Sequence, residues 1–287
     1  MTGAQLLGLG INVSMALMVF GVALSAGRED LRHAFRSKGL LARSLFAMFV
    51  MMPVVALLIA RNLDLNRALL VALLLLALSP VPPILPTKQL KAGGNASFVI
   101  GLFVVAALAA FIVVPAGVNL IGRLFGRDLE VPIAAFARPV LVSVLLPVVI
   151  GLVVARMRPA FAARAAGPVT KFAGLLLLVS FLPVLWIGWG GISAQITNYT
   201  IVAIVAFVGI GLLTGHLLGG PNPDDRTALA LATATRHPGV AIGVLHAIEP
   251  ATNDVALVIV LYLLVGAIVS LPYVKWRMRA HAGPAGG

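Results

Sequence analysis

The chain has 287 residues, of which 61% are hydrophobic and only 10% are charged. Soluble domains are about half apolar and about a quarter charged, so this composition excludes a soluble protein and predicts a single membrane domain over residues 1–287. The formal net charge of +12 does not indicate nucleic acid, because the basic residues follow membrane topology, as described below. Cysteine is absent, which excludes disulfides, thiolate metal ligands and cysteine nucleophiles.

Nine apolar stretches approach the roughly 20 residues that a helix needs to span a bilayer. The sequence therefore predicts an all-α polytopic membrane protein with about nine transmembrane helices and a short basic tail at 275–287. In chain order, the predicted spans are 6–26, 40–60, 67–90, 96–121, 139–155, 172–193, 200–219, 228–247 and 255–274.

Most of the 21 Lys and Arg residues fall in loops that would share one side of the membrane. Cytoplasmic loops carry such an excess of basic residues. The pattern predicts a multi-pass protein with its N-terminus outside and its C-terminus in the cytoplasm, and we expect it in a bacterial inner (plasma) membrane. The basic residues of the predicted cytoplasmic side lie at 28–43, 88–91, 156–171, 226 and 275–279.

The third and eighth predicted spans are interrupted by prolines beside a cation. The third contains Ser79-Pro80-Val81-Pro82-Pro83-Ile84-Leu85-Pro86-Thr87-Lys88, and the eighth contains Thr235-Arg236-His237-Pro238-Gly239. A helix can unwind at membrane depth only where protein or a wet cavity covers the open backbone groups. Paired broken helices indicate the binding site of a secondary transporter, so we expect these two discontinuous helices to cross near the midplane.

The two interruptions lie five spans apart. This spacing predicts a five-helix unit that occurs twice and lacks the first helix of its first copy. Because five is odd, the second copy would run upside down, which is an inverted-topology repeat. The halves would cover about 6–121 and about 131–274, and the fifth span would have no counterpart.

Each interruption ends in a pattern typical of a helix start, with proline at the first turn. The restarting helices would aim free N–H groups and positive dipole ends at the crossing, where a carboxylate would gain most. We therefore expect a site for a small organic anion. The candidate substrate-binding residues are Arg236, His237, Gly239, Lys88, Thr87 and Asn12.

Arg236 is the most informative of these candidates. An Arg at the centre of a span costs about 2.5–3.5 kcal/mol on insertion scales, and all nine Asp and Glu residues fall in loops or at span ends. A bound anion would explain an unpaired guanidinium there; the alternative is that Arg236 snorkels to an interface. His237 could carry a coupling proton or serve as a structural helix cap, and Lys88 could simply anchor its helix end.

At these places the chain resembles the bile acid/sodium symporter family, whose members move organic anions together with sodium. The resemblance rests on the residues Met18 to Leu24, Ser79 to Ser97 and Thr235 to Ala241. It implies a panel domain and a core domain, with two crossing broken helices in the core.

The chain departs from this family at the sodium sites. The family uses a Ser-Asn pair after the first break and a Glu and a Gln before the second, and the aligned residues here are Leu85, Pro86, Ala232 and Arg236. The first three lack a side-chain oxygen. We expect Arg236 to replace a sodium ion as a fixed charge. The alternative is a sodium symporter that uses backbone carbonyls and the oxygens of Thr233, Thr235 and Ser97.

The favoured function is therefore secondary active transport of small organic anions (carboxylates) by alternating access. The expected partners are the anion, membrane lipid and, for a coupled carrier, sodium or a proton; the sequence leaves the oligomeric state open. We expect no enzyme activity and no cofactor, since an H-E-x-x-H pair, an intramembrane Asp pair and cysteine are all absent. A channel is disfavoured because the chain has no filter motif or charged pore stripe.

Overall fold

The computed structural model describes residues 3–25, 37–126, 132, 137, 140–249 and 253–282. Every regular element in these ranges is helical, which confirms the predicted all-α class. Several sequence expectations fall outside the described residues. They are the basic positions Arg28, Arg32 and Arg36, the span ends at Ala26 and Pro139, the start of the second half-repeat at 131, and the last five residues of the tail.

Within the residues that the structure describes, seven helical stretches are long and apolar enough to cross a membrane, and two predicted spans contain shorter apolar helices, Arg67–Leu78 and Leu141–Met157. The elements in order are α1 (Gly3–Leu24), α3 (Lys38–Phe46), the π-helix η1 (Ala47–Met51), α4 (Met52–Asn62), α5 (Arg67–Leu78), α6 (Leu85–Lys91), α7 (Ala96–Leu124), the π-helix η2 (Leu141–Leu145), α9 (Leu146–Met157), α10 (Pro159–Ala194), α11 (Asn198–Leu218), α12 (Pro223–Ala234), α13 (Pro238–Ile248) and α14 (Asn253–Ala282).

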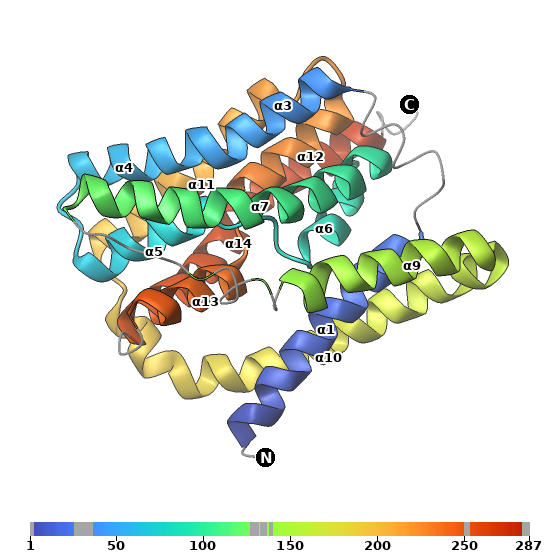
Figure 1. The fold of residues 1–287 in the computed structure, drawn as a ribbon, viewed down its shortest axis with the longest axis horizontal. Helices are drawn as coiled ribbons and strands as arrows, with labels where there is room; N and C mark the ends of the chain where they lie inside the picture. Colours follow the sequence, from blue (N-terminus) through green and yellow to red (C-terminus); the bar gives the residue numbers. More distant parts are fainter. Residues whose placement is uncertain are drawn as a thin grey trace.

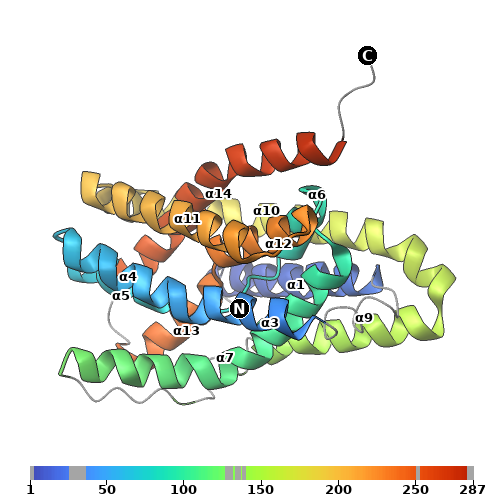
Figure 2. The ribbon, with the colours of Figure 1, turned by 90° about the horizontal axis from the view of Figure 1, so that it is seen from above.

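The helices form two groups (Figures 1 and 2). The first group is α1, α9 and α10, and α1 packs against both of the others. The second group is α3 to α7 with α11 to α14, and it contains nearly all of the main buried cluster. Within it, α12 is buried at every residue from Thr227 to Ala234. A helix surrounded in this way must satisfy its polar groups within the protein, because neither water nor lipid reaches it.

Three glycines at a spacing of four let α11 approach α12 closely. A Cβ at Gly211 would lie 2.9 Å from the Cα of Ala234, one at Gly215 would lie 2.5 Å from the Cα of Ala230, and one at Gly219 would lie 2.4 Å from the Cα of Arg226. Small residues at a spacing of four are typical of helix contacts in membranes. These three glycines let α12 pack against α11, which also fixes the position of Arg236 just after the end of α12.

Replacing Gly215 with alanine is expected to lower the melting temperature of the purified protein. The new Cβ would meet backbone atoms of α12 that cannot move independently, and overpacking of this kind costs about 1–3 kcal/mol. Gly209 lies on the same helix with open space around its Cβ position, so Gly209→Ala is the matched control. Equal melting temperatures for the two variants would show that the close approach is not required.

Candidate functional site

The two proline-rich interruptions meet each other. Helix α5 ends at Leu78 and α6 begins at Leu85, while α12 ends at Ala234 and α13 begins at Pro238. Across the gap between them, the backbone N–H of His237 donates to the carbonyl of Pro80 over 2.9 Å. The bond joins chain segments more than 150 residues apart, so the two interruptions lie side by side in the second helix group; we refer to this place as the crossing.

Prolines leave several carbonyl oxygens near this crossing without a helical donor, and two of them matter here. In an α-helix the carbonyl of residue i accepts from the N–H of residue i+4, and proline has no N–H. Residue i+4 is Pro83 for Ser79 and Pro238 for Ala234. Both carbonyls therefore lack a helical donor and need another partner in a region without water.

A third free carbonyl arises in the π-helix η1. A π-helix joins the carbonyl of residue i to the N–H of residue i+5. For Met48, residue i+5 is Pro53, so this register leaves the Met48 carbonyl without a donor. Single-turn π-helices are frequent at functional sites, and this one turns an ordinary helix carbonyl into an acceptor that faces the crossing.

The Arg236 guanidinium binds two of these three oxygens. Its Nη2 donates to the Met48 carbonyl over 2.6 Å, and its Nη1 donates to the Ser79 carbonyl over 3.3 Å. The side chain is 0% exposed, which excludes the snorkelling alternative within this structure. Its Nε is buried without a hydrogen-bond partner. Carbonyl dipoles solvate the cation here, as they do for ions in selectivity filters.

The charge of Arg236 is not neutralised by an acidic side chain in the described part of the chain. The ion pairs found there, Arg67 with Glu249 and His281 with Asp224, do not include Arg236. Two carbonyl dipoles stabilise a guanidinium but do not cancel its charge. The crossing therefore carries a net positive charge in a medium of low dielectric constant, which attracts anions over a longer range than in water.

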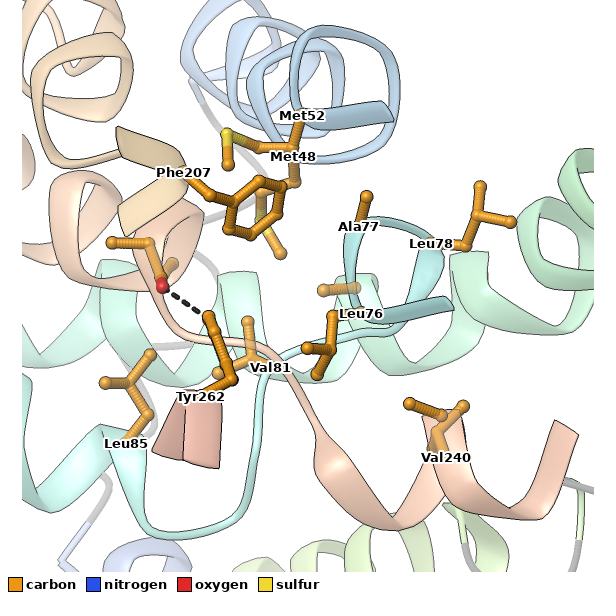
Figure 3. Packing of buried hydrophobic residues seen from close by; sticks show 14 of the residues in the cluster. Met48, Met52, Leu76, Ala77, Leu78, Val81, Leu85, Phe207, Val240 and Tyr262 are labelled. Carbon is orange, nitrogen blue, oxygen red and sulfur yellow. Dashed lines mark hydrogen bonds between the residues drawn. The ribbon is translucent and has the colours of Figure 1, made fainter. Parts of the chain in front are cut away.

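Tyr262 is the residue of the site that sequence reasoning missed. A lone tyrosine in an apolar span carries no local pattern that signals a role beyond packing. In the structure its hydroxyl donates to the Ala234 carbonyl over 2.6 Å and accepts from the Arg236 backbone N–H over 3.1 Å. Figure 3 shows Tyr262 among the buried side chains around the crossing, including Met48, Phe207 and Val240.

His237 and Gly239 lie at the start of α13. His237 is the N-cap residue, and its Nδ1 accepts from the backbone N–H of Val240 over 3.4 Å. An accepting Nδ1 places the proton of the neutral imidazole on Nε2, and this atom is buried without a partner. A Cβ at Gly239 would lie 3.1 Å from the His237 Cε1, so the glycine leaves room for the capping imidazole.

The structure brings some of the remaining candidates to the crossing helices and leaves others apart. Thr87, in the first turn of α6, has a buried hydroxyl without a partner. Lys88, the next residue, donates to the Ser270 hydroxyl of α14 over 2.5 Å, so its ammonium group has a structural partner. Asn12 is exposed on α1, and Ser97 in the first turn of α7 is half-buried and already has a partner.

The two threonines proposed as sodium ligands differ from each other. Thr233 is fully buried, and its hydroxyl donates to the Leu229 carbonyl over 2.8 Å. Thr235 lies in the interruption with an extended backbone and is partly exposed. Among the described residues, no group of three or more His, Asp or Glu side chains could hold a metal ion.

A small apolar cavity lies between the two helix groups. Its free volume is about 10 Å³, close to the space that one water molecule needs, and it is lined only by apolar residues. Pro86 links it to the restart of the first interrupted helix, in the turn that also carries Thr87. The lining residues are Val19, Val22 and Ala23 of α1, Val148 of α9, Pro86 of α6, and Ile100 and Phe103 of α7.

Comparison with known proteins adds a family to this geometry. A family model described as the sodium bile acid symporter family matches residues 12–195 of the chain. The match contains the first interruption and the helices that line the apolar cavity, while Arg236 lies beyond it. In a comparison with curated proteins, none matches the chain.

Proposed function

Because the chain belongs to the sodium bile acid symporter family, a family of membrane transporters, we propose that it is a secondary active transporter of small organic anions. The observation that carries the proposal is Arg236. It is a fully buried cation at the crossing of two interrupted helices, and no ion pair neutralises it in the described part of the chain. A carboxylate is the ligand class that this charge would favour most.

The proposed architecture is that of an alternating-access carrier. Nine spans, with 67–90 and 228–247 discontinuous, would form an inverted five-helix repeat that lacks its first helix. The first helix group would serve as the panel and the second as the core, which would rock about the crossing. The positive-inside pattern supports an N-terminus outside and a C-terminus in the cytoplasm of a bacterial inner membrane.

The substrate carboxylate would approach the Arg236 charge and the first turn of α13. Nε2–H of His237 and the hydroxyl of Thr87 are buried donors without partners, and the Gly239 amide lies in the same turn as the His237 cap. Buried polar groups of this kind are otherwise costly, because they lose water without gaining a bond. The apolar residues around Pro86 would face the carbon skeleton, and the cavity among them would have to widen to admit it.

The oxygen ligation of Arg236 supports a carrier that does not need sodium. Sodium requires oxygen ligands, and the guanidinium occupies the carbonyls of Met48 and Ser79, which could otherwise serve such an ion. Ala232 adds no oxygen. The alternative is a sodium-coupled symporter with ligands from Thr233, Thr235, Ser97 and backbone carbonyls; the Arg236 charge opposes it by repulsion.

Counterflow in liposomes tests the proposed transport. Purified protein is reconstituted with unlabelled carboxylate inside, and uptake of the labelled compound is followed for pyruvate, benzoate and cholate in turn. A carrier is expected to show saturable, transient accumulation of at least one of them. Uptake that does not saturate would indicate a channel, and none of the three accumulating above protein-free liposomes would refute the proposal for this size range.

Anion exchange is expected to proceed at the same rate, within about twofold, in sodium and in choline buffers. The physical reason is that Arg236 supplies permanently the positive charge that a coupling ion would bring. Initial rates of counterflow at matched ionic strength measure this, because salt screening then contributes equally to both. A rate that rises at least tenfold in sodium would favour the symporter alternative.

A further inference from the structure

Tyr262 reaches from α14 into the interruption between α12 and α13. Its side chain is 1% exposed, and the ring of Phe207 packs edge-on against it with centroids 6.1 Å apart. The hydroxyl bonds to the backbone of Ala234 on one side of Thr235 and of Arg236 on the other. One side chain from another helix therefore bridges the segment in which α12 stops.

The hydroxyl replaces the donor that Pro238 cannot supply. In an unbroken helix the Ala234 carbonyl would accept from residue 238, and the Arg236 N–H would donate to residue 232. A hydroxyl can donate one hydrogen bond and accept another at the same time. Tyr262 uses both capacities, so both backbone groups stay paired while Thr235 and His237 keep extended conformations.

We propose that Tyr262 is a positioning residue for Arg236. It fixes the Arg236 backbone, and the Met48 and Ser79 carbonyls fix the far end of the same side chain. Arg236 is thus held at its backbone by Tyr262 of α14 and at its guanidinium by carbonyls of η1 and of Ser79, which follows α5. Tyr262 acts through Arg236 and has no contact with the anion. This inference rests on the anion transport proposed above.

Removal of this hydroxyl tests the inference. Tyr262→Phe is expected to raise the KM for the exchanged carboxylate about tenfold, a typical effect of leaving buried polar partners unpaired. Vmax should stay within twofold of wild type. Tyr273→Phe is the matched control, because Tyr273 lies on the same helix and its hydroxyl instead meets the Nδ1 of His216 at 2.9 Å. An unchanged KM for Tyr262→Phe, or equal changes in both variants, would overturn the inference.

A second substitution separates positioning from folding. Pro238→Ala gives residue 238 an N–H that can pair with the Ala234 carbonyl. Combined with Tyr262→Phe, it is expected to restore at least half of any lost melting temperature. The KM should stay raised, because a continuous helix at 234–238 would no longer hold the Arg236 side chain in its native direction. Recovery of KM together with stability would show that Tyr262 has only a structural role.

Wild-type protein that exchanges none of pyruvate, benzoate and cholate would contradict the proposed function but not the positioning role of Tyr262. Stability then tests that role. Melting temperatures of Tyr262→Phe, Arg236→Gln and the double variant then form a cycle. Because both residues belong to one bonded unit, the double variant is expected to lose less than the two single losses combined. Additive losses would contradict the positioning role.

Discussion

Replacing Arg236 with glutamine is expected to lower the affinity for the transported carboxylate at least about 30-fold, because removal of one partner of a buried charge pair costs about 2–5 kcal/mol. Gln removes the charge, and because its amide ends about where the Arg236 Nε lies, it also loses the guanidinium's bonds to the Met48 and Ser79 carbonyls. Concentration-dependent counterflow gives the KM, and ligand-induced melting shifts give the affinity without transport.

Arg277→Gln provides the control for the loss of a buried guanidinium. Arg277 is 7% exposed and donates to the Thr227 hydroxyl over 2.7 Å and to the Pro223 carbonyl over 3.1 Å. It lies 15 residues after Tyr262 on α14, a distance of about 22 Å along the helix axis. This variant should lose stability but keep its anion affinity within about twofold. An Arg236→Gln protein that resembles it would assign Arg236 a structural role only.

The helix bounds around the site follow from local sequence. Proline removes a backbone donor and also disfavours helix in the residue before it, and these effects depend only on neighbouring residues. The start of α13 at Pro238 with His237 as its cap is one example. The all-α class and the family likewise follow from apolar composition and from motifs along the chain, and both are confirmed.

The partners of Arg236 could not be predicted, because they are tertiary contacts. Met48 and Ser79 lie 188 and 157 residues away, and both contribute a backbone oxygen, which every residue carries. Inspection of the sequence for Asp or Glu partners cannot find backbone oxygens of this kind. The free Met48 carbonyl also depends on a π-helix, and the sequence marks that register only through Pro53. Tyr262 was missed for the same reason, since one hydroxyl in an apolar helix has no periodicity.

The oxygen atoms around Arg236 suggest how sodium dependence could be built into this chain. Ala232 is fully buried in the last turn of α12, four residues before Arg236. The family to which the chain is similar places Glu and Gln at the aligned positions. With Gln at 236, the Met48 and Ser79 carbonyls lose their cationic partner, and a carboxylate at 232 would add the negative charge that attracts a monovalent cation.

The double variant Ala232→Glu/Arg236→Gln is therefore expected to exchange the carboxylate at least tenfold faster in sodium than in choline, in contrast to wild type. Its melting temperature should also rise with sodium concentration, because a ligand that binds only the folded state stabilises it. Ala232→Glu alone is the control: its carboxylate would pair with Arg236, so anion affinity should fall without any response to sodium. A folded double variant whose exchange rate and melting temperature both ignore sodium would show that the guanidinium does not occupy the place of a coupling ion.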